Sequence, residues 1–415
     1  MMILSEKIIQ AAENLKGVAL HTPLQLNIQL SDEFGCNIYL KREDLQAVRS
    51  YKLRGAYNKM FSLSPEQKKQ GVVYTSADNH AQDVAYACKK LNIKDVIFMP
   101  ATTPAQKINQ VKFFGKENVE VVISGDSFDD SYKSAMAYCN EKKSVFIHPF
   151  DDEKVIEGQG TVAKEILDDA DFKIDYLIVP IGGGGLAAGV ISYFSEKSPD
   201  TIIIGAEPQG APSMYESIKS GHVVELEKID TFVDGAAVKK VGQITFDICK
   251  DKISEMILVP EGRICTTILN LYNKEGIIAE PAGALTVAAV SLIKEKLKGK
   301  NVVCVVSGSN NDIMRTEEIK ERSLLYEGLK HYFMIQFPQR PGALKEFVSN
   351  ILGPTDDITY FQFSKKNNRE IAPAVVGLEI KNKADIQSIK DRLTKNKFTF
   401  EYINDNKALF NQLIG

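Results

Sequence analysis

Residues 41–56 read KREDLQAVRSYKLRGA, and this stretch decides which fold and chemistry the chain is expected to have. The pattern predicts a strand over 38–41, a polar turn, and a helix that begins near Lys52. A lysine there can project its amine into a cleft, where the helix N-terminus and Arg54 add positive charge. This suits an aldehyde cofactor that carries a phosphate, because the amine forms a Schiff base and the helix end holds the anion. Most lysines are solvated surface groups, so the rest of the sequence has to support this interpretation.

Four further motifs lie at the ends of predicted strands or the starts of predicted helices. They are SADNHA at 76–81, IGGGGL at 181–186, EPAGA at 280–284 and SGSN at 307–310. In order and spacing, the five motifs resemble the threonine dehydratase (threonine ammonia-lyase) branch of the fold-type-II pyridoxal-phosphate enzymes. The resemblance covers nearly the whole chain and is closest to the biosynthetic short form, which has one C-terminal ACT-like domain.

The composition is that of an ordinary globular protein with two or more domains. Its 415 residues are 44% hydrophobic and 25% charged, and the net charge of −3 offers no basic field for a nucleic acid. No apolar run of about eighteen residues exists to span a membrane, and the N-terminal residues are too charged for a signal peptide. The six cysteines lack CxxC spacing and the five histidines are dispersed. We therefore predict a cytoplasmic protein with reduced thiols and no metal site.

Strand-length apolar runs alternate with helical patterns from about residue 70 to residue 310. Such alternation predicts βαβ units and parallel sheets that are covered on both faces, so the fold class is α/β. The resemblance implies two such open sheets with the cofactor in the cleft between them, as in the tryptophan synthase β-like fold. We expect a catalytic domain over 1–322, with a smaller subdomain at about 50–150.

The pattern changes after a predicted linker at 323–330. Residues 331–415 predict the order βαββαβ, which is the ferredoxin-like arrangement. This segment resembles the ACT-like regulatory domain of biosynthetic threonine dehydratases, and the resemblance implies an amino acid effector, with isoleucine the expected one. The alternative is a small domain that serves only assembly. The predicted strands cover 331–337, 358–364, 374–380 and 398–403, and the predicted helices run through 352 and over 384–394.

The resemblance assigns the central chemistry to Lys52. It forms the Schiff base with pyridoxal 5'-phosphate and then removes the Cα proton of the substrate, after which the β-hydroxyl leaves. The product enamine hydrolyses to a 2-oxo acid and ammonia, so L-threonine would give 2-oxobutanoate. Ser307 would meet the pyridine nitrogen, where a neutral hydroxyl favours β-elimination over transamination. The alternative role for Ser307 is that of an ordinary turn or cap serine.

The motif at 76–81 is expected to hold both cofactor and substrate. By resemblance, Asn79 bonds the phenolic oxygen of the cofactor, and the surrounding loop receives the substrate carboxylate. Ala77 stands where related serine racemases carry a proton-transferring serine, so elimination is favoured over racemisation. Glu280 is expected at the ring edge, although an acid that caps a helix is nearly as good an interpretation. The substrate or ring-edge candidates are Ser76, Ala77, Asp78, His80 and Glu280.

The glycine-rich loop is expected to wrap the cofactor phosphate. Glycines let backbone N–H groups converge on an anion at a helix N-terminus, where a Cβ would obstruct. The same loop formally satisfies a dinucleotide fingerprint, with Glu207 about where a ribose-binding acid would sit. The Schiff-base lysine motif and Ser307 have no role in a dehydrogenase, and they decide between the two. The cofactor-binding candidates here are Gly182, Gly183, Gly184, Gly185 and Leu186.

The chain departs from the family pattern at several positions. Asp78 and Asp83 replace two glycines of the family motif around Asn79. Tyr51 replaces a phenylalanine, and Glu157 replaces a small residue. A charged Asp78 would repel a substrate carboxylate within about 5 Å unless it points to solvent. The substitution at Asp83 is expected to cost less, because an acid in the first turns of a helix interacts favourably with the helix dipole.

Every reactive position is intact, so we predict an active enzyme. The alternatives are a catalytically weakened homologue, an L-serine dehydratase and an amino acid sensor. A cysteine-synthase-like β-replacement enzyme shares the fold and the cofactor, but the KLRGA signature and the C-terminal domain argue against it. The resemblance suggests a homotetramer.

Overall fold

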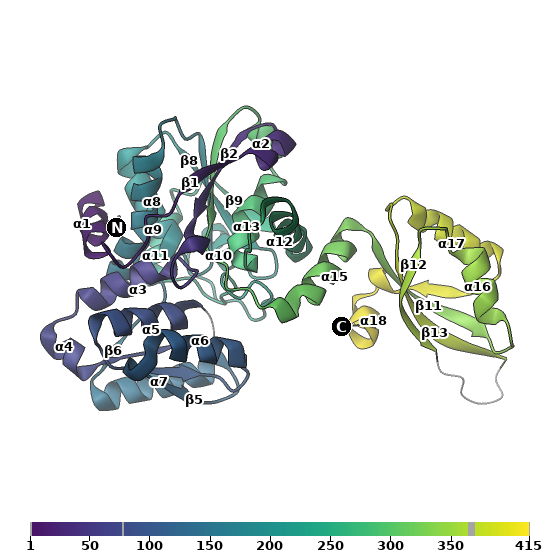
Figure 1. Ribbon diagram of the computed structural model, residues 1–415, viewed down its shortest axis with the longest axis horizontal. Coiled ribbons are helices and arrows are strands. Elements are labelled where there is room, and N and C mark those ends of the chain that lie inside the picture. Colours follow the sequence, from purple (N-terminus) through teal and green to yellow (C-terminus); the bar gives the residue numbers. More distant parts are fainter. Residues whose placement is uncertain (1, 77–78, 364–369, 415) are drawn as a thin grey trace. The chain divides into compact units, whose positions relative to one another are not determined.

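The computed structural model describes residues 2–76, 79–363 and 370–414. The chain forms two compact units, Met1–Met314 and Arg315–Gly415 (Figure 1). Among the residues that the structure describes, no helix has both the length and the apolar character needed to cross a membrane.

The first unit contains a six-stranded sheet in the order β1-β2-β10-β7-β8-β9. All neighbouring strands are parallel except β1 and β2, which are antiparallel. The parallel strands are nearly continuous apolar runs because helices cover both faces of the sheet. The strands are β1 (Leu24–Asn27), β2 (Asn37–Arg42), β7 (Tyr176–Pro180), β8 (Ile202–Pro208), β9 (Glu255–Val259) and β10 (Asn301–Val306).

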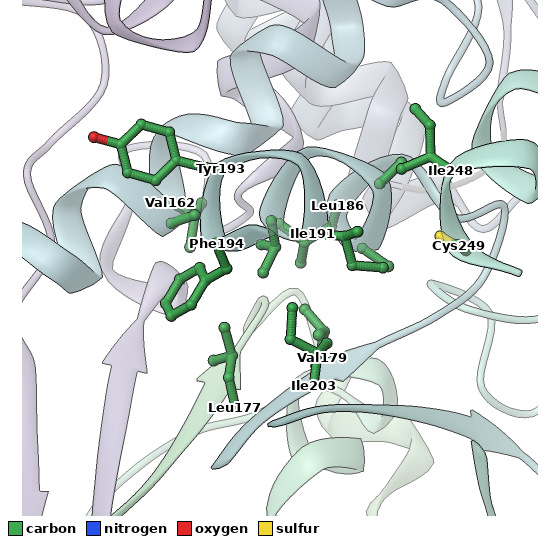
Figure 2. Close-up of a cluster of buried hydrophobic side chains, with 14 of the residues drawn as sticks. Val162, Leu177, Val179, Leu186, Ile191, Tyr193, Phe194, Ile203, Ile248 and Cys249 are labelled. Carbon is green, nitrogen blue, oxygen red and sulfur yellow. The ribbon is translucent and has the colours of Figure 1, made fainter. Parts of the chain in front are cut away.

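A large hydrophobic core lies between this sheet and helix α9 (Gly185–Lys197). Figure 2 shows Leu186, Ile191 and Phe194 of α9 facing side chains of the sheet, among them Val179 and Ile203. These side chains are almost completely buried, which explains why α9 is apolar on nearly all sides. The other helices of this part are α1 (Ser5–Asn14), α2 (Ile28–Phe34), α8 (Glu153–Asp169), α10 (Ser213–Ser220), α11 (Gln243–Cys249), α12 (Glu261–Glu275), α13 (Pro281–Val290) and α14 (Lys294–Leu297), with 3-10 turns at Glu43–Leu45 and Ile313–Arg315.

A second, four-stranded parallel sheet has the order β5-β4-β3-β6. Helices α5, α6 and α7 lie around it in Figure 1. One mostly parallel and one fully parallel sheet in the first unit confirm the predicted α/β class. The elements of this smaller part are α3 (Lys52–Phe61), α4 (Pro65–Gln70), β3 (Val72–Thr75), α5 (Asn79–Leu91), β4 (Asp95–Met99), α6 (Ala105–Gly115), a 3-10 turn (Lys116–Asn118), β5 (Val119–Ile123), α7 (Phe128–Lys142) and β6 (Val145–Phe146).

Helix α3, which begins at Lys52, packs closely on α8. A Cβ atom on Gly158 would lie 2.4 Å from the carbonyl oxygen of Arg54, so only glycine fits there. The backbone N–H of Gly55 donates to Oε1 of Gln159 at 3.2 Å. The KLRGA motif and the EGQGT stretch at 157–161 are therefore two sides of one contact between α3 and α8.

The second unit has the predicted βαββαβ order, with an antiparallel sheet β12-β13-β11-β14. The predicted linker at 323–330 differs from the structure, because α15 continues through Glu327 and ends at Gly328, whose φ is 71°. The hydroxyl of Tyr332 donates to Glu321, which ties α15 to the sheet of this unit. The elements are α15 (Thr316–Glu327), β11 (Lys330–Pro338), α16 (Ala343–Ile351), β12 (Asp357–Phe363), β13 (Ile371–Glu379), α17 (Asp385–Lys395), β14 (Phe400–Tyr402), a 3-10 turn (Ile403–Asp405) and α18 (Lys407–Leu413).

Candidate active site

Lys52 is the first residue of α3, and the residues before it are tied to the end of β10. The backbone N–H of Tyr51 donates to the carbonyl oxygen of Ser307 at 3.2 Å, and Ser50 forms a β-bridge with Gly308. The Oγ of Ser50 also accepts a hydrogen bond from the backbone N–H of Lys52 at 3.2 Å. Two motifs that are far apart in the sequence therefore meet through their backbones.

The Lys52 amine reaches the loop that packs on the glycine motif. Its Nζ donates to the carbonyl oxygen of Gly235 at 3.3 Å. The next residue, Ala236, leaves no room for a side chain on Gly182, because a Cβ there would lie 2.9 Å from the Ala236 Cα. The lysine and the glycine loop are thus neighbours across one short segment of backbone.

The glycine loop can be built only from glycine at several of its positions. A Cβ on Gly183 would lie 2.2 Å from the Phe150 ring, and Gly184 has a φ of 93°, which other residues rarely adopt. Gly185 then begins α9, so the loop ends at a helix N-terminus, where backbone N–H groups and the helix dipole favour an anion. The loop has the geometry expected of a phosphate cradle.

Leu186 was predicted among the cofactor-binding residues, and this stays a prediction for its backbone. The Leu186 side chain is buried in the core between α9 and the large sheet (Figure 2), because α9 turns this face toward the strands. It can contribute only its backbone N–H to a ligand at the helix start.

Ser307 follows β10 and is buried. Its hydroxyl donates to the carbonyl oxygen of Ala282 in the first turn of α13 at 3.2 Å. The motifs at Ser76, Gly182 and Ser307 all come directly after the carboxyl ends of parallel strands, which is where open α/β sheets bind ligands. A contact of Ser307 with the pyridine nitrogen stays a prediction.

Glu280 does not cap helix α13, although it occupies the N-cap position. Its Oε1 accepts a hydrogen bond from Nδ2 of Asn79 at 2.7 Å, and its Oε2 accepts one from the backbone N–H of Asn310 at 3.1 Å. The capping interpretation of this acid is therefore wrong. Asn310 in turn donates from Nδ2 to Oδ1 of Asn79 at 3.0 Å. The sequence analysis quoted Asn310 in the SGSN motif but gave it no role.

Of the remaining candidates in the motif at 76–81, the structure describes two and leaves out the other two. Ser76 is buried directly after β3. His80 is buried in the small subdomain, where its Nε2 lies 3.3 Å from the carbonyl oxygen of Ile147 and its ring meets Tyr74 edge-on. These contacts belong to the core of that subdomain. Ala77 and Asp78 lie outside the described residues, so the predictions made for them stay predictions.

Arg54 was expected to add positive charge near the phosphate, and the structure shows a different role. Its guanidinium is fully buried and forms two-pronged ion pairs with Glu43, at 2.8 Å to each oxygen, and with Glu165, at 2.6 and 2.8 Å. Lys41 also pairs with Glu165, at 2.7 Å. Burial alone would raise the pKa of Glu165, but Arg54 and Lys41 outweigh it and lower that pKa. The arginine anchors α3 and so positions Lys52 indirectly.

Glu207 is not presented to a ribose, as a dinucleotide site would require. Its buried carboxylate accepts hydrogen bonds from the backbone N–H groups of Met214, at 2.7 Å, and Tyr215, at 2.9 Å. Burial raises the pKa of Glu207 to about 8, although these hydrogen bonds oppose the shift. Glu207 therefore holds the start of α10. It does not serve as the ribose-binding acid that a dinucleotide site would require.

The family departures inside the described residues lie in different surroundings. Asp83 lies in the second turn of α5, within the first turns that the dipole argument named, and it is fully buried. Its charge contributes to the raised pKa of Tyr74, for which burial is the main cause. Glu157 is paired with Lys154 at 2.9 Å, and Tyr51 precedes α3 as its N-cap residue.

These residues fit pyridoxal phosphate. Lys52 would hold its aldehyde carbon, the loop at Gly182–Gly185 its phosphate, and Asn79 and Ser307 its ring. The fit rests on the glycine cradle, which side chains would fill, and on the lysine that borders it. Among the described residues, no group of three or more His, Cys, Asp or Glu could hold a metal ion.

Comparisons with known proteins agree with this site. Residues 16–308 match the family model for pyridoxal-phosphate dependent enzymes, and residues 321–413 match the model for the C-terminal regulatory domain of threonine dehydratase. A relative from Halalkalibacterium halodurans, L-threonine dehydratase biosynthetic IlvA, is 58% identical over 409 residues, which cover 99% of both chains. The protein of the same name from Bacillus subtilis is 55% identical over 413 residues, covering 100% of this chain and 98% of that one.

Solved structures show the same likeness. The processed form of threonine deaminase isoform 2 from Solanum lycopersicum is 40% identical, with a TM-score of 0.72 over 78% of this chain and 96% of that chain. A serine racemase from Dictyostelium discoideum is 32% identical, with a TM-score of 0.69 over 75% of this chain and 99% of its own. The chain belongs to the pyridoxal-phosphate-dependent enzymes, and within them to the threonine dehydratase family.

Proposed function

We propose that this protein is a threonine ammonia-lyase that converts L-threonine to 2-oxobutanoate and ammonia, the first step of isoleucine biosynthesis. The observation that carries the proposal is the position of Lys52, whose amine donates to Gly235 beside a loop that only glycine can form. The relatives that share the full length of the chain are named L-threonine dehydratases. L-serine, which lacks only the γ-methyl group, is the alternative substrate.

Each residue has a defined task in this reaction. When bound, pyridoxal phosphate supplies the electron sink for the charge that develops at Cα. Nζ of Lys52 takes the Cα proton, and a neutral Ser307 hydroxyl at the ring nitrogen keeps the charge near Cα, so that the β-hydroxyl leaves. The N-terminal end of α5, with Ser76 before it, receives the substrate carboxylate.

Regulation by isoleucine is the second part of the proposal. Residues 321–413 match a regulatory domain, and a biosynthetic enzyme is usefully inhibited by the end product of its pathway. Helix α16 follows Gly342, whose φ is 85°, so the chain turns sharply there and leaves backbone N–H groups at the helix start. Those groups suit the carboxylate of an amino acid. Inhibition requires that isoleucine bind a less active state more tightly.

A homotetramer and a cytoplasmic location complete the proposal. Exposed apolar side chains around β1, α2 and the end of α12 supply a surface for self-association, and Ile28 is 69% and Tyr272 60% exposed. Gln29 donates to the carbonyl oxygen of Lys274 at 3.2 Å, so these elements are neighbours. The six cysteines carry reduced thiols, as expected in a reducing compartment.

The test is an assay of the purified full-length protein. With L-threonine it should release 2-oxobutanoate and ammonia in equal amounts, and isoleucine should slow the reaction. L-serine in place of threonine measures the preference between the two substrates. A protein that binds isoleucine but has no activity on either amino acid would be a sensor, and the proposed reaction would be refuted.

A further inference from the structure

The side-chain amide of Asn79 is held at both of its ends. Its Nδ2 donates to Oε1 of Glu280 at 2.7 Å, and its Oδ1 accepts from Nδ2 of Asn310 at 3.0 Å. Asn79 is 1% and Glu280 4% exposed, so water competes little for these hydrogen bonds. The three residues come from α5, from the residue before α13, and from the loop after β10.

This pair of contacts fixes which way round the amide lies. If the amide turned over, its oxygen would face the Glu280 carboxylate and its NH2 group would face the NH2 group of Asn310. Both contacts would then be repulsive, so only one orientation is stable. In that orientation Nδ2 uses one N–H on Glu280 and has its second N–H for another acceptor.

Glu280 and Asn310 are themselves fixed by the backbone around them. Asn310 donates from its backbone N–H to Oε2 of Glu280 and from Nδ2 to the carbonyl oxygen of Val48, at 3.1 and 2.9 Å. The backbone N–H of Glu280 donates to the carbonyl oxygen of Gly308 at 3.2 Å. A Cβ on Gly308 would lie 2.4 Å from Oε1 of Glu280, so this close arrangement requires glycine in the SGSN motif.

We propose that Glu280 and Asn310 are positioning residues that orient Asn79 so that its second Nδ2 hydrogen is donated to the phenolic oxygen of pyridoxal phosphate. The inference rests on the cofactor of the proposed function and not on the choice of substrate. A donor at that oxygen stabilises the ionised phenolate, whereas an acceptor there stabilises the neutral phenol. The two forms of the lysine-bound cofactor absorb in different bands, so the orientation of Asn79 sets the ratio of the long-wavelength band to the short-wavelength band.

The decisive variant is Asn310→Asp in the full-length protein loaded with pyridoxal phosphate. It replaces the NH2 donor by a carboxylate oxygen of nearly the same size, which favours the reversed Asn79 amide. We expect the band ratio to fall about three- to tenfold, the net effect of losing one hydrogen bond of ordinary strength. Asn79→Ala should give a similar fall, and Asn310→Ala a smaller one. Asn273→Asp makes the same change at an exposed position of α12 and should leave the ratio unchanged.

The outcomes separate positioning from a purely structural role. A lower melting temperature of Asn310→Asp with an unchanged band ratio would overturn the inference, and so would a ratio within about twofold of the wild type in a fully loaded protein. A wild-type protein that shows the band but does not deaminate threonine would count against the proposed substrate alone. A wild-type protein without any such band would overturn both proposals.

Discussion

The backbone N–H of Tyr51 donates to the carbonyl oxygen of Ser307 at 3.2 Å, and this hydrogen bond joins the lysine motif to the serine motif. A second one runs from the N–H of Ser309 to the carbonyl oxygen of Arg49, at 3.0 Å. The start of α3 and the end of β10 are therefore held by main-chain geometry, which does not depend on side-chain rotamers. Catalytic groups need positions fixed to within a fraction of an ångström. These two backbone hydrogen bonds fix the backbone of Lys52 relative to that of Ser307.

Replacement of Lys52 by alanine should abolish both turnover and the absorption band of the lysine-bound cofactor. We expect kcat to fall by more than about 10³-fold, because one group both holds the cofactor and carries the proton. Lys59→Ala is the matched control, since Lys59 lies in the same helix and pairs with Asp152 at 2.5 Å. Absorbance spectra and release of 2-oxobutanoate measure the two effects. A Lys52→Ala protein that keeps band and activity would refute the assignment.

Substitution of Gly183 by alanine should weaken binding of pyridoxal phosphate by at least about tenfold. The added Cβ would lie 2.2 Å from the Phe150 ring, so the loop must move away from its anion-binding conformation. The double variant Gly183→Ala, Phe150→Leu removes the obstructing ring and should recover part of the affinity. Titration of the cofactor-free protein with pyridoxal phosphate measures both. An equal loss in the single and double variants would show that the clash is not the cause.

Arg54→Met should destabilise the protein by about 3–5 kcal/mol, because it leaves the carboxylates of Glu43 and Glu165 buried without their main partner. Lys59→Met breaks a more exposed ion pair on the same helix and should cost no more than about 1 kcal/mol. Denaturant unfolding of the first-unit transition measures the difference. A loss of the same size in both variants would mean that burial of the Arg54 cluster adds nothing.

The same cluster predicts a dependence of stability on pH. Burial raises the pKa of Glu165, but the charges and hydrogen bonds of Arg54 and Lys41 prevail, so the folded-state value lies below the usual 4.5. A lowered carboxyl pKa contributes stability that is complete above about pH 4.5 and is lost as the pH falls through the folded-state value. The wild type should therefore lose stability below about pH 4.5 more steeply than Glu165→Gln. Equal slopes for the two proteins would contradict this account.

The sequence predicted the elements well because their signals are local. The strands at 176–180 and 119–123 have the bounds that the structure gives, since each is a short run rich in apolar and β-branched residues, the first fully buried and the second at the edge of its sheet. The βαββαβ order of the second unit is equally readable from alternating patterns. The end of the first unit was placed too late, because α15 has no breaker before Gly328 and its sequence does not show which unit it belongs to.

What the sequence could not supply is the direction of side chains. Arg54 follows Lys52 by two residues, and a helix turns such neighbours about 200° apart, so Arg54 points into the buried ion cluster. Glu280 stands at a helix start, where an acid commonly caps, but the glycine at 308 lets it approach Asn79 instead. Both roles depend on a partner distant in the sequence, Glu165 for Arg54 and Asn79 for Glu280, which no local pattern encodes.

Asp78→Gly should raise kcat/KM for threonine. The family pattern has glycine at this position, and a carboxylate close to the substrate carboxylate repels it. For a partly screened pair of charges the gain would be about 1–2 kcal/mol, or roughly tenfold. Asp83→Gly, the second departure from the family pattern, which lies within α5, is the comparison and should not raise activity. An unchanged or lower kcat/KM in Asp78→Gly would mean that this carboxylate points away from the substrate.

A chain that ends at Met314 tests whether isoleucine acts through the second unit. The first compact unit ends there, whereas a chain that ends near Ser323 would cut through α15. The shortened protein should keep pyridoxal phosphate and threonine turnover, because Lys52, the glycine loop and Ser307 all lie before the cut. It should no longer respond to isoleucine, which requires a coupling of about 1–3 kcal/mol between two sites.

The control for this cut is a change that leaves the chain whole. Arg340→Ala removes the ion pair with Glu346 beside the start of α16 and should weaken inhibition without a change in the uninhibited rate. Activity against isoleucine concentration is measured for all three proteins, together with cofactor absorbance to confirm that the shortened chain is folded. If the chain ending at Met314 stays sensitive to isoleucine, the effector binds in the catalytic unit, and the second unit serves assembly alone.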